Sequence, residues 1–254
     1  MRKRQQPQTG IKDERILRTL QSYNGPFSAS RLEQFAQCPF RYFIENVLGI
    51  QEGDTLFSAK EQGSLMHSVL ERLYRTMFAS EDEREVNTAR DDIATTRKMV
   101  AHIWSDEVAK LNSRYMKIPW VHALLDSLFH TLEFFLSEEQ QEEQLRTTIP
   151  WRFEHPFGIA GKSGSDDMFF MRFPGGEEYG FCGIIDRVDI RKGNQQAVVI
   201  DYKGNKRLKK RDIEMGREIQ LLLYWQYLQQ RMGLNVIGAE ICSYKTGERH
   251  GFYR

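Results

Sequence analysis

One stretch in the second half of the chain constrains the fold more than any other: Val198-Val199-Ile200, which is apolar at consecutive positions. A strand that is apolar on both faces belongs in the middle of a sheet that is covered on both sides. Directly after it come Asp201 and Lys203, whose positions two residues apart put both side chains on the same face. An acid and a lysine at the end of a buried strand require a partner, a metal ion or solvent in a cleft.

The hydrophobic pattern changes at Thr148 and divides the chain into two parts. Before Thr148 the spacing of apolar residues predicts helices, and after it short apolar runs between turn residues predict strands and one more helix. The helices are expected over 30–48 with a break at Pro39, 62–78, 88–112, 119–146 and 213–231, and the strands over 151–157, 168–173, 179–190, 197–203 and 236–244. We therefore predict an α/β fold with a poorly ordered start, 1–26, and one domain, 27–254, which is mainly helical over 27–147 and holds the sheet over 148–254.

Two local patterns concern the polar residues of the helical part. Ser30 followed three residues later by Glu33 predicts a capping box at the start of the first helix. The acidic run Ser137-Glu-Glu-Gln-Gln-Glu-Glu143 is expected to be a solvated face of the last helix before the strands.

Composition excludes several classes of protein. The 36 Lys and Arg residues against 35 Asp and Glu give a net charge of +1, so any nucleic-acid binding must use local positive charge. A hydrophobic fraction of 40% excludes a disordered chain, and the absence of an apolar run near 18 residues excludes a transmembrane helix. The basic start lacks the apolar stretch of a secretory signal. Three widely spaced cysteines do not make a disulfide framework, and a reducing, cytoplasmic location is expected.

The residue types in the second half favour phosphodiester hydrolysis. Asp186 lies late in an expected strand, fifteen residues before Asp201. Carboxylates are hard oxygen ligands suited to Mg²⁺ or Mn²⁺, which polarise a phosphoryl oxygen and make a bound water more acidic. Lys203 can orient or deprotonate that water, or offset the charge that grows on phosphorus. The alternative is that Asp186 and Asp201 are ordinary strand-end residues and Lys203 is a solvated neighbour.

The order of motifs resembles the PD-(D/E)xK nuclease superfamily, and within it the RecB-like branch that includes the nuclease domains of RecB, AddA and AddB and the CRISPR-associated RecB-like exonucleases. Its core is Ile185-Asp186 followed by Asp201-Tyr-Lys203. The further motifs lie in the family's order, at 28–33 with 37–43, at Gly63-Ser-Leu-Met-His67, at Glu154-His-Pro-Phe157, at Gly183-Ile-Ile-Asp-Arg187 and at Gln220-Leu-Leu-Leu-Tyr224. The resemblance covers about 27–244 and implies a mixed central sheet flanked by helices, with a helical N-terminal subdomain.

The resemblance implies a metal-dependent deoxyribonuclease that uses Mg²⁺ or Mn²⁺. It would be an exonuclease acting on DNA ends or single strands in repair or recombination. The implied metal ligands are His67, Asp186, Asp201 and the backbone carbonyl of Tyr202, and Lys203 would assist the attacking water. From the residues alone, His67 is an ordinary helix histidine, and Gly63 one turn before it allows the backbone of another segment to approach.

A second group of residues would support the site or contact DNA. Gln220 and Tyr224 lie one turn apart on an expected helix; without the resemblance, they belong to an amphipathic helix packed on the sheet. Arg187 is placed in this group because it completes its motif. Glu154 is either a structural strand residue or a partner of Lys203.

The stretch from Lys203 to Arg211 holds six basic residues and no acid. Such a run is commonly a solvated loop. Since it directly follows the strand of Asp201, phosphate contact by Lys206 and Arg207 is the favoured interpretation.

The cysteines depart from the pattern of the AddB-like members. Cys38 matches the first cysteine of the iron–sulfur site in those proteins, but the three closely spaced cysteines near the C-terminus are absent. A cluster needs four ligands, so none is expected in this chain. Cys38 is then expected to be a small buried side chain, as are Cys182 and Cys242 in their strands.

The partners expected are DNA and a helicase subunit, and no membrane. The 254 residues contain no Walker A motif, so unwinding would come from a partner or from a further part of the chain. One alternative is a non-catalytic DNA-binding or scaffolding module of a helicase–nuclease complex. Another is a restriction-type endonuclease, which the Gly-x-x-x-His and Gln-x-x-x-Tyr motifs disfavour.

Overall fold

The computed structural model describes residues 25–50, 56–78, 93–145, 147–160, 168–191, 195–205 and 207–254. Almost all of the stretch expected to be poorly ordered, 1–26, lies outside these ranges, and so does Lys206.

The helices follow the predicted order with shifted ends. They are α2 (Ala29–Gln37), α3 (Pro39–Tyr42), a π-helical turn η1 (Phe43–Val47), α4 (Ala59–Met77), α5 (Ile93–Ala109), a 3₁₀ turn η4 (Tyr115–Lys117), α6 (Pro119–Leu145), α7 (Lys210–Glu214) and α8 (Gln220–Gln230). One helix was expected over 213–231, but the structure has two: α7 overlaps only the start of that range, and α8 covers most of it. Ser28, not Ser30, caps α2, because its hydroxyl accepts the Arg31 N–H, so the predicted capping box is wrong.

The strands are β1 (Phe27–Ser28), β2 (Ile149–Phe157), β3 (Phe169–Arg172), β4 (Glu178–Arg191), β5 (Gln196–Lys203), β6 (Asn235–Ser243) and β7 (Arg249–Tyr253). The long strand β4 organises the sheet. Its first part pairs with β1 in parallel and with β3 antiparallel, and its second part pairs antiparallel with β2 and β5. Strand β6 is parallel to β5, and β7, which the sequence did not predict, is antiparallel to β6. The sheet is mixed, as the resemblance implied.

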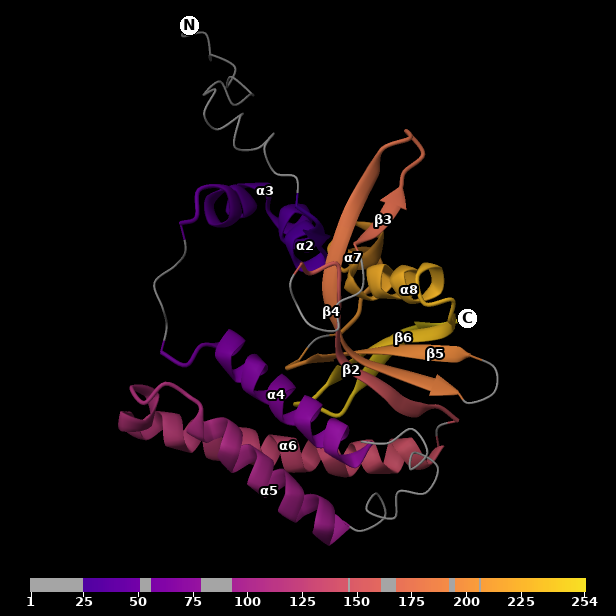
Figure 1. Cartoon of the computed structure of the whole chain (residues 1–254). Coiled ribbons are helices and arrows are strands. Elements are labelled where there is room, and N and C mark those ends of the chain that lie inside the picture. The colour runs from indigo at the N-terminus through magenta and orange to yellow at the C-terminus, as the bar shows by residue number, and fades with distance from the viewer. Residues whose placement is uncertain are drawn as a thin grey trace, which may run out of the picture.

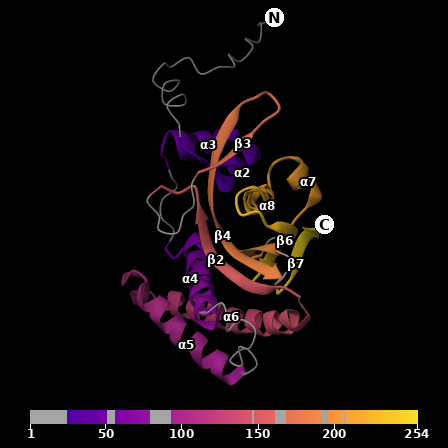
Figure 2. The same cartoon turned by 45° about the vertical axis from the view of Figure 1, so that its right-hand side comes forward.

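Helices cover both faces of this sheet (Figures 1 and 2). Helices α4, α5 and α6 lie together against one face, and α2 and α8 lie on the other. The two-sided burial predicted for β5 is confirmed: Val198 and Ile200 belong to the core with α4, α5 and α6, whereas Ala197 and Val199 belong to the core with α8. The end of β5 is thereby fixed between the two helical layers.

A buried network of charges anchors α6 to the sheet. Arg187 of β4 is fully buried, donates to both carboxylate oxygens of Asp189, and contacts Glu139 at 2.8 Å. Glu139 also binds Arg249 of β7. The acidic run at 137–143 was expected to be a solvated face. For Glu139 this is wrong, because its carboxylate binds Arg187 and Arg249 of the sheet and is buried.

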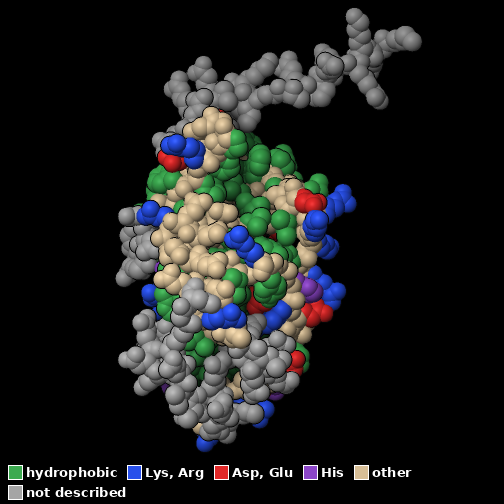
Figure 3. Space-filling model, turned by 90° about the vertical axis from the view of Figure 1, so that its right-hand side faces the viewer, with side chains coloured by type: hydrophobic (Ala, Val, Ile, Leu, Met, Phe, Trp, Pro, Cys, Tyr) green, Lys and Arg blue, Asp and Glu red, His purple; other side chains and the backbone are tan. Residues whose placement is uncertain are grey.

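None of the helices in the described ranges combines the length and the apolar character needed to cross a bilayer. Hydrophobic side chains do gather on the upper part of the face drawn in Figure 3. The β3–β4 hairpin exposes Met168, Phe170, Phe173 and Tyr179.

Candidate active site

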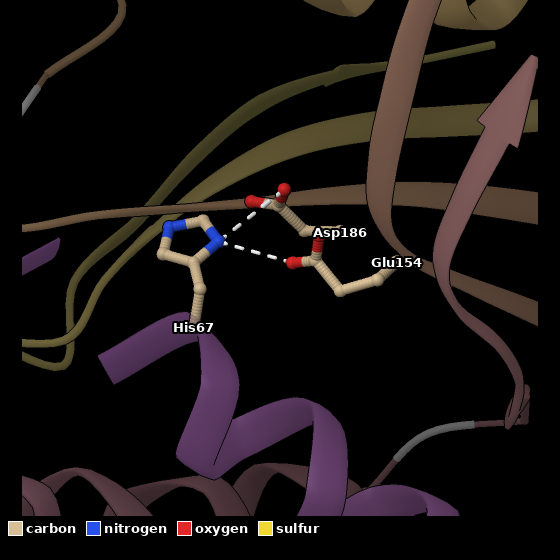
Figure 4. Close-up of side chains that lie close together, drawn as sticks. All are labelled: His67, Glu154 and Asp186. Carbon is tan, nitrogen blue, oxygen red and sulfur yellow. Dashed lines mark hydrogen bonds and ion pairs between the residues drawn. The ribbon is translucent and has the colours of Figure 1, made fainter. Parts of the chain in front are cut away.

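His67 reaches the sheet from α4. The helix begins with a capping box formed by Ser58 and Glu61, and its apolar stripe packs into the core. His67 lies between Met66 and Val69 of that stripe and points toward the strands (Figure 4). Its Nδ1 lies 3.2 Å from Glu154 Oε1 and 3.5 Å from Asp186 Oδ1, and its Nε2 lies 3.1 Å from the carbonyl oxygen of Tyr202. All these neighbours are acceptors, so both ring nitrogens act as donors.

The electrostatics of His67 agree with that geometry. Burial lowers the pKa of His67, but hydrogen bonds and charges from Asp186 and Glu154 outweigh burial and raise it to about 10. The imidazole is therefore protonated at neutral pH when no metal ion is bound.

Glu154 was left undecided by the sequence, and the structure places it beside His67. It lies on β2 between Phe153 and His155, which pair with Arg187 and Ile185 of β4. Its φ of +43° is in the left-handed region, which a residue other than glycine adopts only when its surroundings hold it there. This local conformation brings the carboxylate of β2 to the same point as Asp186 of β4.

Asp186 is more deeply buried than Glu154, with an exposed fraction of 8% against 22%. Its Oδ2 accepts a 2.7 Å hydrogen bond from the backbone N–H of Tyr202. Burial, and then the charge of Asp201, raise the pKa of Asp186 to about 6, although His67 and Lys203 act in the opposite direction. Folding therefore makes the ionisation of Asp186 less favourable than in the unfolded chain.

Asp201 and Lys203 meet at the end of β5, as their spacing predicted. Lys203 Nζ lies 2.8 Å from Asp201 Oδ2 and 3.1 Å from Oδ1. Burial lowers the pKa of Lys203, but the charges of Asp201 and Asp186 outweigh it, so the pKa is raised above its ordinary value. Lys203 is therefore a fixed positive charge in the metal-free protein, which favours charge stabilisation over proton acceptance.

Gln220 and Tyr224 are in contact on α8. Gln220 Nε2 donates to Tyr224 Oη at 2.9 Å. Tyr224 is buried, and burial followed by the charges of Asp201 and Asp186 raises its pKa well above the ordinary value. A Cβ at Gly183 would lie 2.9 Å from the Tyr224 ring, so the glycine makes room for this tyrosine. The charges of Asp201 and Asp186 therefore reach the Tyr224 hydroxyl.

Glu33 is a site residue that sequence reasoning missed. Its Oε1 accepts hydrogen bonds from the backbone N–H groups of Ile219 at 2.7 Å and Gln220 at 2.9 Å. These are the first N–H groups of α8, whose own N-cap residue supplies no side-chain hydrogen bond. Glu33 of α2 therefore fixes the start of the helix that carries Gln220 and Tyr224.

Other expected site residues lie elsewhere. Arg187 is fully buried, which excludes contact with DNA in this structure and leaves a role in support. Arg207 forms a surface ion pair with Glu248 at 2.8 Å. The expected backbone approach at Gly63 is wrong, because a Cβ there would meet no described atom within 4 Å.

The cysteines differ from one another in exposure. Cys38 is exposed, so its expected burial is wrong; its Sγ lies 3.5 Å from the Arg41 N–H at the start of α3. Cys182 is half-buried, and Cys242 is buried as expected.

The donor atoms of His67, Glu154 and Asp186 all lie within 4.8 Å of one another. One imidazole nitrogen with carboxylate oxygens is a donor set that suits Mn²⁺ or Mg²⁺. Burial and the charge of Asp201 raise the pKa of Asp186, and a divalent ion bound there would favour its ionised form. Asp201 lies outside this group and against Lys203, although its charge acts on Asp186. These residues fit a divalent metal ion.

Comparison with known proteins agrees with this arrangement. The family model of the PD-(D/E)XK nuclease superfamily matches residues 26–251. The chain belongs to this superfamily. The resemblance inferred from the motifs is thereby confirmed.

Similar curated proteins are each named as one subunit of an ATP-dependent helicase/deoxyribonuclease. The one from a Thermoanaerobacter species is 31% identical over 207 residues, which cover 78% of this chain and 17% of the relative. The one from Clostridioides difficile is 28% identical over 221 residues, which cover 84% of this chain and 18% of the relative. The chain thus spans less than a fifth of the length of these relatives.

Proposed function

We propose that this chain is a metal-dependent deoxyribonuclease that hydrolyses phosphodiester bonds as an exonuclease at DNA ends or on single strands. One observation carries the proposal: His67 of α4, Glu154 of β2 and Asp186 of β4 converge beside the Asp201–Lys203 pair. The individual motifs are short, but their residues come from three separate elements and meet at one point. Membership of the nuclease superfamily supports the same chemistry.

We propose that Mg²⁺ or Mn²⁺ is held by His67, Asp186, Asp201 and the carbonyl of Tyr202, with Glu154 added to the implied set. The bound ion would polarise the phosphoryl oxygen and make a water more acidic. His67 must lose its proton before it can act as a ligand. Asp201 must share its carboxylate between the ion and Lys203, since its two oxygens already contact Nζ.

Lys203 is proposed to offset the negative charge that grows on the phosphoryl oxygens, because it is held charged beside the acids. Gln220 and Tyr224 support the acids from α8. Lys206 and Arg207 are proposed to contact DNA phosphates in the stretch after β5; for Arg207 this requires exchange of its exposed ion pair with Glu248.

The similar curated proteins are named as helicase/deoxyribonuclease subunits. By analogy we propose that this nuclease works with a helicase partner in DNA repair or recombination in the cytoplasm.

The test uses single- and double-stranded DNA labelled at the 5′ or the 3′ end, incubated with Mg²⁺, Mn²⁺ or EDTA. We expect metal-dependent shortening from an end, and its loss in Lys203→Met. Internal cuts at early times would indicate an endonuclease instead. DNA binding without any cleavage in either metal would indicate a non-catalytic module.

A further inference from the structure

A groove along the first turns of α4 is lined in part by two residues of the metal-ligand cluster, His67 and Glu154. The groove encloses about 420 Å³, and its lining includes Lys60, Gly63, Ser64, His67 and Glu154. This volume lies in the range of small-molecule sites, roughly 300–1,000 Å³. A ligand in the groove would therefore contact the same His67 that faces Glu154 and Asp186 (Figure 4).

Gly63 forms part of the floor of this groove, and the fold does not explain its presence. It is the fifth residue of a 19-residue helix, where glycine is less favourable than alanine. Its φ is not among the positive values, so the backbone does not require glycine. A Cβ at this position would meet no atom of the described residues within 4 Å, so packing does not require it either.

We propose that Gly63 keeps the groove open for the nucleotide next to the scissile phosphodiester bond, and that Ser64 and Lys60 contact the sugar–phosphate backbone of that nucleotide. The inference rests on the proposed nuclease function. It adds to that function a binding position for the neighbouring nucleotide. A side chain at position 63 would occupy the space one turn away from His67.

The charges along the groove agree with an anionic strand. The carboxylate of Glu71, one turn after His67, is paired with Arg75 at 2.8 Å. Lys60, two turns before His67 on α4, is exposed. The strand is therefore expected to run from the metal-ligand cluster over Gly63 toward Lys60.

The test compares Gly63→Ala and Gly63→Leu with a matched control, Thr76→Leu, which adds bulk on an exposed position of the same helix outside the groove. Two substrates are used with Mn²⁺: a single-stranded 12-nucleotide DNA, and bis(p-nitrophenyl) phosphate, which has no neighbouring nucleotide. We expect Gly63→Leu to lower kcat/KM on the oligonucleotide at least about tenfold more than on the small substrate, mainly through KM. Thr76→Leu should match the wild type on both.

Stability separates this effect from misfolding. Both Gly63 variants are expected to melt at or above the wild-type temperature, because the new side chain meets open space and improves the helix. Gly63→Ala should show a smaller loss on the oligonucleotide than Gly63→Leu, in proportion to its size.

Equal kcat/KM values of wild type and Gly63→Leu on the oligonucleotide would overturn the inference. If the wild type cleaves neither substrate, the proposed function fails. The role of the groove is then tested separately, by measuring the binding of a fluorescein-labelled 12-nucleotide DNA in Ca²⁺. Weaker binding by Gly63→Leu than by Thr76→Leu would then support the groove, and equal binding would refute it.

Discussion

Replacing Asp186 by asparagine is expected to stabilise the metal-free protein and to abolish its nuclease activity. Asparagine keeps the shape of the side chain, and its amide oxygen can still accept the hydrogen bond from the Tyr202 N–H. The change removes a carboxylate that is 8% exposed and that lies near the charge of Asp201. Burial and that charge are the two causes that raise the pKa of Asp186.

The magnitude follows from the pKa of Asp186, which rises from 3.8 to about 6 on folding. At about 1.36 kcal/mol for each tenfold change in the ionisation constant, this rise costs the folded state about 3 kcal/mol. An acid with a raised pKa destabilises the fold only where it is ionised in the unfolded chain. The cost is therefore absent below pH 3.8, grows between pH 3.8 and about 6, and is complete above that.

The assay is urea unfolding in EDTA at pH 4 and pH 8. Asp186→Asn should be up to about 3 kcal/mol more stable than the wild type at pH 8, with little gain at pH 4. The matched variant is Asp201→Asn, which removes the partner of Lys203 at 2.8 Å. Because it leaves a mostly buried ammonium without its carboxylate, we expect it to lose about 1–3 kcal/mol, which is the opposite sign.

Lower stability of Asp186→Asn at pH 8, or a gain of equal size at both pH values, would refute this account of the site. Calorimetric titration with Mn²⁺ completes the test, because both variants are expected to bind the ion more weakly. Unchanged affinity in both would mean that the metal binds elsewhere.

Four further predictions concern other residues of the site. Lys203→Met should lower the rate of cleavage about 10²–10⁴-fold while Mn²⁺ binding persists, and near wild-type turnover would remove Lys203 from the mechanism. Since the pKa of His67 is raised to about 10, Mn²⁺ must displace its proton, and calorimetry between pH 7 and pH 9 should show affinity rising up to about tenfold per pH unit; a flat profile would contradict this. Glu33→Ala should lower the free energy of unfolding in urea by about 1–2 kcal/mol and should reduce the rate of cleavage. Glu33→Gln, which retains a hydrogen-bond acceptor, should keep most of the stability and most of the activity. Cys38→Ser should change stability by less than about 0.5 kcal/mol and leave a colourless, active protein, because the side chain is exposed; a brown preparation that loses its visible absorbance in this variant would show a cluster.

Local sequence patterns predicted the parts of the site that depend on neighbours in the chain. The apolar run before Asp201 predicted a strand buried on both faces, because consecutive side chains of a strand point to its two faces in turn. The spacing of Asp201 and Lys203 predicted that they share a face of the strand, and their contact at 2.8 Å agrees with this. The helical spacing around His67 predicted α4 itself.

Contacts between distant segments were not predictable in the same way. Glu33 caps a helix that begins 187 residues later, and the local pattern suggested instead that it caps its own helix. Glu139 lies in an acidic run, and nothing in that run distinguishes the one carboxylate that binds Arg187 and Arg249. Glu154 lies 87 residues from His67, and no glycine marks the left-handed backbone that turns it toward the histidine.

The neighbouring residues Asp186 and Arg187 show why the site lies where the two helical layers meet. Adjacent residues of a strand point to opposite faces, so β4 presents the acid to the site and the arginine to the other side. Arg187 lies 4.7 Å from the centre of the Tyr74 ring of α4 and binds Glu139 of α6, which ties β4 to the helical layer that carries His67. On the opposite layer, Glu33 caps α8, and the charges of Asp201 and Asp186 act on Tyr224 of that helix. We therefore expect the buried ion pair of Arg187 with Glu139, and its contact with Tyr74, to help fix α4 and its His67 against β4.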